Sequence, residues 1–334
     1  MTKAEYTTRG PVPQDVIEAV PFEAPDLAEG QVLLELLAAP INPSDLLMLT
    51  GQYGILPPLP AVGGSEGVAR VATHGPGVTA PAIGQTVLLP VGSGTWATHR
   101  VAEAASLVPL PDVDPVQLSM LTVNPPTAHL MLSEFVDLEP GDWVIQNAAN
   151  SGVGAYLIAL ASLRGLKTVN VVRRESLVAP LMAAGADVVL VDGVVDGLGL
   201  AERVAAATDG AAIRLGVDAV GGAATERLGQ ALGDGATLVT YGAMSGEPCT
   251  LSPALLIFKQ LTVRGFWLAQ WYRTTPPARQ QEVLGMLAGR IAAGELSAPI
   301  HATYPVSAIK EAVAAAAGGR RDGKVVVVGE SLRT

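Results

Sequence analysis

The clearest pattern of apolar and polar positions lies between residues 142 and 172. A mostly apolar run, Trp143–Asn147, leads into a turn of small residues, and a second apolar run, Thr168–Val172, ends the segment. Gly165 stands between them, where the left-handed residue after a helix is expected. Apolar residues with a helical period lie in the middle, at Val153, Leu157 and Leu160. The pattern predicts strand, tight turn, helix and strand within about thirty residues, the size of a βαβ unit.

After this unit, short apolar runs continue to alternate with helical patterns. The predicted strands are almost wholly apolar, which is typical of a parallel sheet buried on both faces. These strands are Val188–Val191, Leu215–Val220, Thr237–Tyr241 and Leu261–Trp267. Helices are expected between them, such as Leu200–Ala207 and Ala223–Leu232. We therefore expect an α/β protein with a Rossmann-type, doubly wound parallel sheet.

The chain before about residue 116 has a different pattern, rich in proline and glycine. Turn signals at Asn42-Pro43, Gly63-Gly64 and Gly75-Pro76-Gly77 separate short strand-like runs. The runs are Val32–Leu37, Gly67–Thr73 and Thr86–Pro90. This pattern predicts a second, β-rich domain with an antiparallel, barrel-like sheet.

The C-terminal segment follows a helix that ends near Gly294. It predicts one helix over Tyr304–Ala317 and one strand over Lys324–Val328, and we expect both to return to the first domain. The expected domains are thus residues 1–118 together with 295–334, and residues 119–294.

Composition limits the function classes. The chain has 334 residues, of which 49% are hydrophobic, enough for two domains with full cores. A net charge of −10 argues against a nucleic-acid partner, which requires a basic surface. No apolar run is long enough to span a membrane, and the N-terminus has no signal-peptide core, so a cytoplasmic protein is expected. Cys249 is the only cysteine, and the four histidines show no metal-ligand spacing, so no metal site is expected.

The small-residue turn after Asn147 predicts a phosphate site. Such a turn lets backbone N–H groups approach a ligand, and the following helix directs its positive end at the same point. The dinucleotide pattern Gly-x-Gly-x-x-Gly is incomplete, because Ala149 and Ser151 occupy the first two glycine positions and only Gly154 stands in the third. A plain βαβ crossover with a small-residue turn is the alternative interpretation.

Arg173 and Arg174 follow the second strand of this unit, where an NAD site usually carries an acidic residue. Two guanidinium groups suit the 2′-phosphate of NADP, because each can bind it through two hydrogen bonds. The sequence therefore favours NADPH over NADH, and a solvated loop with two surface arginines is the alternative.

Six segments spread along most of the chain resemble the medium-chain dehydrogenase/reductase superfamily and, within it, the mitochondrial-type trans-2-enoyl-thioester reductases. They are Ile41–Asp45, Gly51–Gly54, Pro60–Gly67, Asn124–Ala128, Gln146–Gly154 and Phe258–Trp271. The resemblance implies a GroES-like β-rich catalytic domain beside the Rossmann domain. It also implies NADPH-dependent reduction of the C=C bond of 2-enoyl esters of CoA or acyl-carrier protein, in fatty acid metabolism.

The zinc-dependent alcohol dehydrogenases of the same superfamily have different residues at two positions. They carry a cysteine near the position of Asn42 and Gly-His-Glu in place of Gly64-Ser65-Glu66. Neither soft ligand is present, so the zinc-free branch is the better match. Reduction of an activated C=C bond does not need the metal, because the thioester carbonyl already withdraws electrons from the β-carbon.

Tyr53 is the expected catalytic residue, by resemblance to the tyrosine of the family's Gly-x-Tyr-Gly segment. A phenol is protonated at neutral pH and can give its proton to the α-carbon of the enolate that hydride transfer leaves. A tyrosine that only packs in a turn is the alternative. Asp45 and Glu66 are the nearest acidic residues, and we expect structural roles for them.

The resemblance also implies how the cofactor is held. Asn124 is expected near the nicotinamide, Arg173 and Arg174 at the 2′-phosphate, and Lys324 as a charge from the returning tail. The expected pyrophosphate residues are Ser151, Gly152, Val153 and Gly154. The turn expected to close the nucleotide site is Tyr241, Gly242, Ala243 and Met244. Backbone groups for the carboxamide are expected from Phe266, Trp267, Leu268 and Ala269.

The expected partners are the carrier of the thioester and a second copy of the chain. An anionic carrier requires a local basic patch, for which the candidates are Arg273, Arg279, Arg320 and Arg321. Related proteins are often dimers, so a homodimer that pairs strand Leu261–Trp267 across a two-fold axis is expected. His129 departs from the family pattern, which has an aromatic hydroxyl residue there.

Three functions remain open at this point. The first is the enoyl-thioester reductase. The second is a zinc-independent reductase of quinones or other activated alkenes, which shares the fold and cofactor but not the tyrosine donor. The third is a non-catalytic protein that binds NADPH.

Overall fold

A computed structural model describes residues 1–23, 25–319 and 321–332. The chain divides into two compact units, which we call the first unit (Met1–Val123 with Glu282–Thr334) and the second unit (Asn124–Gln281). The boundaries between the two units lie between residues 123 and 124 and between residues 281 and 282. The sequence places them between residues 118 and 119 and between residues 294 and 295. Helix α10 (Pro277–Ala292) runs across the second division.

The second unit is built on a parallel sheet with the strand order β11-β10-β9-β12-β13-β14. Its strands are β9 (Trp143–Gln146), β10 (Lys167–Val172), β11 (Val188–Val191), β12 (Ile213–Asp218), β13 (Thr237–Thr240) and β14 (Thr262–Gly265). The direction of winding reverses between β9 and β12. In open α/β sheets a ligand binds at the carboxyl ends of the strands beside such a reversal.

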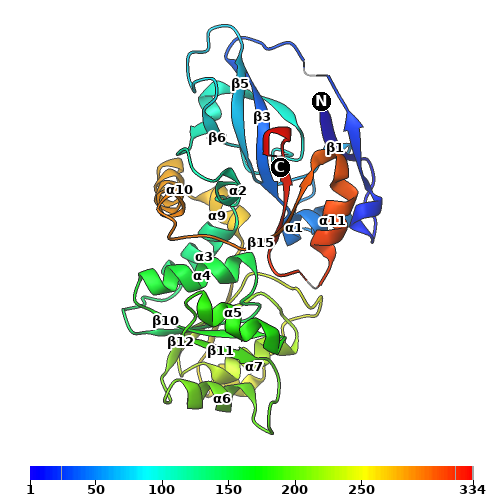
Figure 1. The fold of residues 1–334 in the computed structure, drawn as a ribbon. Helices are drawn as coiled ribbons and strands as arrows, with labels where there is room; N and C mark the ends of the chain where they lie inside the picture. Colours follow the sequence, from blue (N-terminus) through cyan, green and yellow to red (C-terminus); the bar gives the residue numbers. More distant parts are fainter. Residues whose placement is uncertain (24, 320, 333–334) are drawn as a thin grey trace. The chain divides into compact units, whose positions relative to one another are not determined.

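Helices cover both faces of this sheet (Figure 1). The helices of this unit are α3 (Asn124–Ser133), α4 (Gly152–Leu163), η3 (Glu175–Leu177), α5 (Val178–Ala183), α6 (Leu200–Ala207), α7 (Ala223–Ala231), α8 (Pro253–Ile257) and α9 (Leu268–Thr274). Ile158 of α4 and Leu181 of α5 belong to one buried cluster, and Val204 of α6 and Leu228 of α7 belong to another. The doubly wound architecture expected from the sequence is therefore confirmed.

The first unit is β-rich. One sheet has the order β15-β16-β3-β5-β6-β8 with β7 also paired to β3, and a smaller sheet has the order β2-β1-β4. The strands are β1 (Thr2–Tyr6), β2 (Ile17–Pro21), β3 (Gln31–Pro40), β4 (Ala61–Val62), β5 (Val68–His74), β6 (Thr86–Leu88), β7 (His99–Glu103), β8 (Val108–Pro109), β15 (Ile300–Pro305) and β16 (Lys324–Val328). Alternating side chains of β3 pack into one core with Trp96 and Val327.

The C-terminal segment also belongs to this unit. Strand β16 pairs antiparallel with β3, through Val326 opposite Pro40 and Val328 opposite Ala38. The short helices of the unit are η1 (Pro13–Asp15), α1 (Pro43–Thr50), η2 (Ala104–Ser106), α2 (Pro115–Leu118), η4 (Val306–Ala308), α11 (Ile309–Ala317) and η5 (Glu330–Leu332).

The single helix predicted over Tyr304–Ala317 is wrong at its start. Tyr304 and Pro305 end β15, which pairs in parallel with β16, and the α-helix begins only at Ile309. A residue before proline is held in an extended conformation and proline cannot continue a helix, so the break after Tyr304 follows from Pro305.

The helices of the two units lie within residues 1–23, 25–319 and 321–332. None of them combines the length and the apolar character that a membrane span requires.

Candidate functional site

The turn between β9 and α4 leaves no room for larger side chains. Ser151 is the N-cap of α4, and its hydroxyl accepts a hydrogen bond from Gly154 N at 3.1 Å. A Cβ atom on Gly154 would lie 2.3 Å from the carbonyl oxygen of Ala149, so only glycine fits there. Gly152 and Val153 open the helix, where N–H groups have no intrahelical acceptor. The turn therefore fits a bound phosphate group of a dinucleotide.

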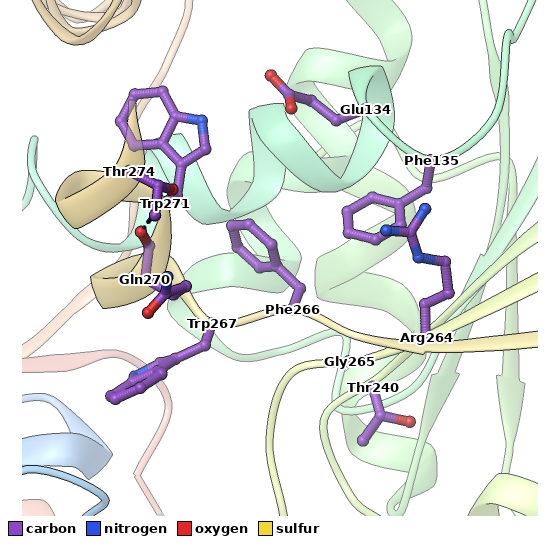
Figure 2. Close-up of a pocket in the computed structure, with 10 residues that line it drawn as sticks. All are labelled: Glu134, Phe135, Thr240, Arg264, Gly265, Phe266, Trp267, Gln270, Trp271 and Thr274. Carbon is purple, nitrogen blue, oxygen red and sulfur yellow. Dashed lines mark hydrogen bonds between the residues drawn. The ribbon is translucent and has the colours of Figure 1, made fainter. Parts of the chain in front are cut away.

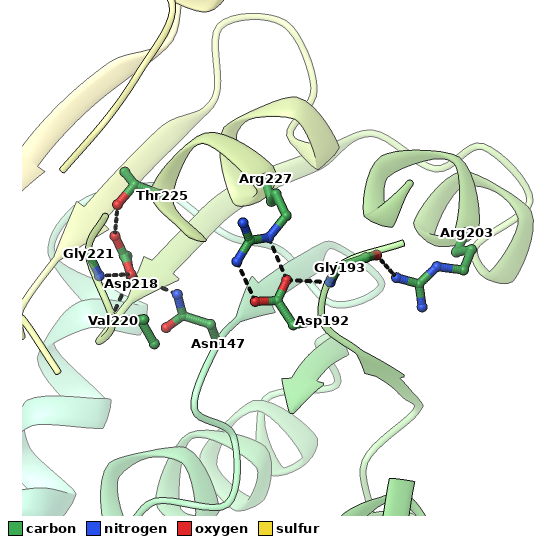
Figure 3. Close-up of polar contacts among 9 residues, drawn as sticks. All are labelled: Asn147, Asp192, Gly193, Arg203, Asp218, Val220, Gly221, Thr225 and Arg227. Atoms are coloured by element: carbon green, nitrogen blue, oxygen red, sulfur yellow. Dashed lines mark hydrogen bonds and ion pairs between the residues drawn. The ribbon is translucent and has the colours of Figure 1, made fainter. Parts of the chain in front are cut away.

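The turn after β12 is organised around the buried carboxylate of Asp218 (Figure 3). One oxygen accepts hydrogen bonds from Asn147 Nδ2 at 2.7 Å, Val220 N at 2.9 Å and Gly221 N at 3.0 Å. The other accepts from Thr225 Oγ1 at 2.6 Å. Four donors on one buried carboxylate hold β9, the turn and α7 together at the carboxyl edge of the sheet.

The predicted turn Tyr241–Met244 packs against this one. Tyr241 N donates to Asp218 O at 3.0 Å and Met244 N donates to Ala219 O at 3.1 Å. A Cβ atom on Gly242 would lie 2.8 Å from Ala219 O, so the close approach of the two turns requires glycine.

The phenol of Tyr241 lies near Ser151, so two of the turns predicted for the cofactor approach each other. Burial raises the pKa of this phenol, which therefore stays protonated. Ala243 and Met244 are exposed at the outer side of the turn.

Arg173 and Arg174 follow β10 as predicted. Arg173 is exposed and Arg174 is half-buried, where it begins η3. On the neighbouring strand, Asp192 follows β11, and its N–H donates to Val172 O at 2.7 Å. The carboxylate of Asp192 therefore lies one strand away from the arginine pair.

Arg227 of α7 binds that carboxylate through two hydrogen bonds, from Nε at 2.7 Å and from Nη2 at 2.6 Å (Figure 3). Gly193 also contributes, since its N–H donates to Asp192 at 2.8 Å and its carbonyl accepts from Arg203 at 2.5 Å. Our sequence reasoning missed this ion pair, because Asp192 and Arg227 lie 35 positions apart in two elements whose contact depends on the fold.

Phe266, predicted to face the carboxamide, lines a cavity of about 510 Å³ in the second unit (Figure 2). Its ring meets Phe135 edge-on at 5.9 Å between centroids, and the guanidinium of Arg264 lies 5.1 Å from the Phe135 centroid. Phe266 N donates to Thr240 O at 2.9 Å, so this N–H already belongs to the sheet.

The next residues predicted for the carboxamide, Trp267, Leu268 and Ala269, lie at the start of a helix and not in the sheet. Leu268 and Ala269 open α9, whose first N–H groups have no intrahelical acceptor, and Trp267 is its N-cap. Of the predicted backbone groups, those of Leu268 and Ala269 thus remain suited to a carboxamide.

Tyr53 lies in the first unit, in the loop that follows α1. Gly51 ends the helix in the left-handed conformation with φ 79°, and Tyr53 is half-buried two residues later. Asn124 is buried at the first position of α3 in the second unit.

The first unit contains a buried charged network around Asn42. Lys324 Nζ donates to Asn42 Oδ1 at 2.5 Å and to Ile41 O at 3.2 Å, and Asn42 Nδ2 donates to Glu66 Oε1 at 2.8 Å. Glu66 Oε2 also accepts from the N–H of Thr122 at 3.0 Å. The side chain of Lys324 is thus directed into its own unit, and its predicted part in cofactor binding stays a prediction.

Asp45 completes this network. Its carboxylate accepts a hydrogen bond from Asn42 N at 2.7 Å, and this bond is part of the capping box of α1. It also accepts a hydrogen bond from Ser65 Oγ at 2.5 Å. Burial raises the pKa of Asp45 to about 6 and also raises that of Glu66, while it lowers the pKa of Lys324. Both carboxylates are buried and hydrogen-bonded, as expected for structural residues, and the lysine ammonium supplies the positive charge beside them.

No group of three or more His, Cys, Asp or Glu side chains among residues 1–23, 25–319 and 321–332 has the arrangement of a metal site. The predicted basic patch is divided: Arg273 and Arg279 belong to the second unit and Arg321 to the first. Arg320 lies outside the described residues.

Comparisons with known proteins agree with this architecture. Residues 28–112 match the family described as the alcohol dehydrogenase GroES-like domain, and residues 152–287 match the family described as zinc-binding dehydrogenase. The mitochondrial enoyl-[acyl-carrier-protein] reductase of Rattus norvegicus is 41% identical over 309 residues, which is 91% of this chain and 82% of the rat protein. The Homo sapiens enzyme of the same name is also 41% identical over the same shares.

Solved structures with a similar fold include enoyl thioester reductases, at lower sequence identity. A complex of Etr1p with NADP and crotonyl-CoA has a TM-score of 0.88, with 26% identity over 98% of this chain and 99% of that one. The mitochondrial 2-enoyl thioester reductase Etr1p/Etr2p heterodimer from Candida tropicalis has a TM-score of 0.84, with 26% identity over 98% and 100%. A mycobacterial quinone oxidoreductase has a TM-score of 0.80, with 27% identity over 98% and 99%.

The comparisons correct one expectation. The rat and human relatives are named as mitochondrial proteins, which overturns the expected cytoplasmic location. The sequence argument considered only a membrane span and a secretory signal, and neither feature distinguishes a cytoplasmic protein from a mitochondrial one.

Proposed function

From the premise that this chain belongs to the enoyl-thioester reductases of the medium-chain dehydrogenase/reductase superfamily, we propose that it reduces trans-2-enoyl thioesters with NADPH. The observation that carries the proposal is the phosphate turn at Ser151–Gly154 in a chain 41% identical to an enoyl-[acyl-carrier-protein] reductase. The thioester is an ester of CoA or of acyl-carrier protein.

The residues of the second unit bind the cofactor in this proposal. Ser151 to Gly154 direct N–H groups at the pyrophosphate, and Arg173 with Arg174 bind the 2′-phosphate. Bound NADPH supplies a hydride to the β-carbon of the enoyl thioester. The Tyr241 phenol keeps its proton because burial raises its pKa, so it lies near Ser151 without adding negative charge near the phosphates.

Tyr53 completes the reaction in this proposal. Its phenol gives a proton to the α-carbon of the enolate, and the phenolate regains a proton from water, so the reaction consumes one hydride and one proton for each C=C bond. The Gly51 turn places this side chain in a loop where it is only half-buried, which leaves part of the ring accessible to a substrate.

A Tyr53→Phe variant tests the assignment. NADPH oxidation with crotonyl-CoA should fall by roughly 10²- to 10⁴-fold, the usual contribution of a general acid, while the Kd for NADPH stays unchanged. Tyr304→Phe is the matched control, because Tyr304 is also a half-buried tyrosine of the first unit and should leave the rate unchanged. Equal rates for Tyr53→Phe and the wild type would exclude Tyr53 as the donor.

The second candidate function is the reduction of quinones or simple enones, which the similarity to the mycobacterial quinone oxidoreductase supports. A panel of enoyl-CoA esters, quinones and enones, each with NADPH and NADH, separates the candidates. Quinone turnover that is indifferent to Tyr53→Phe would support this second function, and saturable NADPH binding without oxidation would support a non-catalytic protein.

We also propose a homodimer formed through strand β14. Its four residues are all exposed, at the edge of the sheet. Thr262 N donates to Ala236 O, directly before β13, and Phe266 N donates to Thr240 O of β13, so by alternation the N–H groups of Val263 and Gly265 point away from β13. Exposed apolar side chains precede this strand in the chain, with Phe258 at 79% and Ile257 at 61% exposure. An unpaired edge beside apolar side chains is a template for a second copy.

Val263→Pro tests this dimer, because it removes an outward N–H and leaves the donors to β13 in place. Sedimentation should show a dimer for the wild type and a monomer for the variant. A wild-type monomer at micromolar concentration, or a variant that remains dimeric, would exclude pairing through β14.

A further inference from the structure

The loop that carries Tyr53 has neither helix nor strand from residue 52 to residue 60. Its start is fixed by the end of α1, where Gly51 N donates to Met48 O at 3.3 Å and Gln52 N donates to Leu47 O at 2.8 Å. Beyond that point the backbone depends on contacts from other segments to keep one conformation.

Arg9 contacts the chain on both sides of Tyr53. Its Nη2 donates a hydrogen bond to the carbonyl oxygen of Pro57, four residues after Tyr53. A Cβ atom on Gly51, two residues before Tyr53, would lie 3.3 Å from Cδ of Arg9, so the aliphatic part of Arg9 lies against Gly51. The backbone beside Arg9 is also attached to α1, because Gly10 N donates to Leu49 O at 3.3 Å.

Arg9 is itself held in place. Its guanidinium lies beside the phenol of Tyr6, which is 2% exposed and belongs to the core of the first unit; burial raises the pKa of that phenol, and the charge of Arg9 opposes the shift. Arg9 is half-buried, so the hydrogen bond to Pro57 is partly shielded from water. A planar guanidinium with several donors can bind the carbonyl while its charge lies beside the phenol.

We infer that Arg9 is a positioning residue for Tyr53, which it serves by holding the loop at Gly51 and Pro57. This inference rests on the proposed role of Tyr53 as the proton donor. A general acid must lie within hydrogen-bond reach of the atom that it protonates. Misplacement by about 1 Å can cost up to about 10²-fold in rate, so loosening the loop should slow protonation.

The test begins with Arg9→Met, which keeps the aliphatic contact with Gly51 and removes the hydrogen bond to Pro57 and the charge beside Tyr6. The kcat with crotonyl-CoA should fall about tenfold or more, while the Kd for NADPH stays unchanged. An unchanged kcat would overturn the inference even when Tyr53→Phe is inactive as proposed.

Arg100→Met is the matched control. Arg100 also donates a hydrogen bond to a backbone carbonyl of the first unit, Gly94 O at 2.7 Å, but it holds a different loop. This control should keep the wild-type kcat. An equal loss of kcat in both variants would assign the effect to general weakening of the unit and overturn the inference.

A double-variant cycle separates positioning from other effects. Arg9→Met should slow the wild type, and it should add little in the Tyr53→Phe background, because the group that it positions is already absent. The same factor in both backgrounds would show that Arg9 acts on the rate independently of Tyr53.

Amide hydrogen exchange tests the restraint without reference to catalysis. Exchange in residues 52–56 should be faster in Arg9→Met than in the wild type or in Arg100→Met. If Tyr53→Phe proves fully active, the proposed function of Tyr53 fails, and this measurement still decides whether Arg9 holds the loop. Unchanged exchange in residues 52–56 would overturn the restraint itself.

Discussion

The guanidinium of Arg227 binds both carboxylate oxygens of Asp192, at 2.7 and 2.6 Å, on the strand next to the predicted 2′-phosphate site. Adjacent strands lie about 4.8 Å apart, so a free carboxylate after β11 would face the same anion that Arg173 and Arg174 are expected to bind. A bidentate partner neutralises this carboxylate and fixes it against α7. The hydrogen bonds to Asp192 also raise the pKa of Arg227, so the neutralising charge is permanent.

Arg227→Met should therefore weaken binding of NADPH more than binding of NADH. The exposed negative charge of Asp192 repels the 2′-phosphate, with an expected loss of up to about tenfold in affinity at low salt. Added salt should reduce the difference, because exposed charges are screened over about 10 Å at 0.1 M. Fluorescence titration of both cofactors measures the two Kd values directly.

The double variant Arg227→Met with Asp192→Asn supplies the control for this prediction. Removing the carboxylate should restore the affinity for NADPH if charge is the cause. Equal losses for NADPH and NADH in Arg227→Met would instead mean that the ion pair only holds β11 and α7 together.

Gly154→Ala should abolish the geometry of the phosphate turn. The added Cβ atom would lie 2.3 Å from the backbone oxygen of Ala149, and neither group can move as a flexible side chain can. The Kd for NADPH should rise at least tenfold, and the free energy of unfolding should fall by about 1–3 kcal/mol, as in other overpacked sites. Isothermal titration and urea unfolding measure the two effects.

Gly289→Ala is the control for added volume. Gly289 lies in α10, and a Cβ atom there would meet nothing within 4 Å. Alanine favours a helix over glycine by about 1 kcal/mol, so this variant should be slightly more stable and bind NADPH normally. Normal NADPH binding by Gly154→Ala would contradict the proposed cofactor turn.

The parts of the fold that depend on local pattern could be predicted from the sequence. Strand β11 at Val188–Val191, helix α6 at Leu200–Ala207 and strand β16 at Lys324–Val328 lie where the apolar runs place them. Each is a short segment whose periodicity matches its burial. The left-handed Gly165, with φ 69°, was likewise predictable from its place after the helix.

The parts of the fold that depend on contacts between distant segments could not be predicted from the sequence. Strand β15 was missed because its burial is low and its partner, β16, follows only after a helix. The hydrogen bond of the Lys324 ammonium to Asn42 was not predicted, because charge alone does not reveal a buried partner 282 positions away. The same limit hid the contact of Arg9 with Pro57.

The buried carboxyl of Asp45 should make stability depend on pH in a defined direction. Burial raises its pKa from 3.8 to about 6, and Lys324, Glu66 and Tyr6 are its charged or titratable neighbours. Between about pH 4 and about pH 6 the folded protein keeps a proton that the unfolded chain has lost. The stabilisation is therefore complete below about pH 4 and is lost as the pH rises through about 6, by about 3 kcal/mol in total. Asp45→Asn should remove this part of the slope.

Urea unfolding of the wild type and of Asp45→Asn at several pH values between 4 and 7 measures this difference. Asp142→Asn is a control of opposite sign, because the hydrogen bond from Glu139 N and the contact with Arg214 lower the pKa of Asp142. Its carboxylate adds stability above the unfolded pKa that is lost as the pH falls, so removing it should flatten the acid limb instead. Glu66 also titrates with a raised pKa, so a residual fall towards neutral pH should persist in Asp45→Asn. If the free energy of unfolding changed with pH in the same way in the wild type and in Asp45→Asn, Asp45 would be ionised throughout. The charge of Lys324 would then offset the cost of burying the carboxylate.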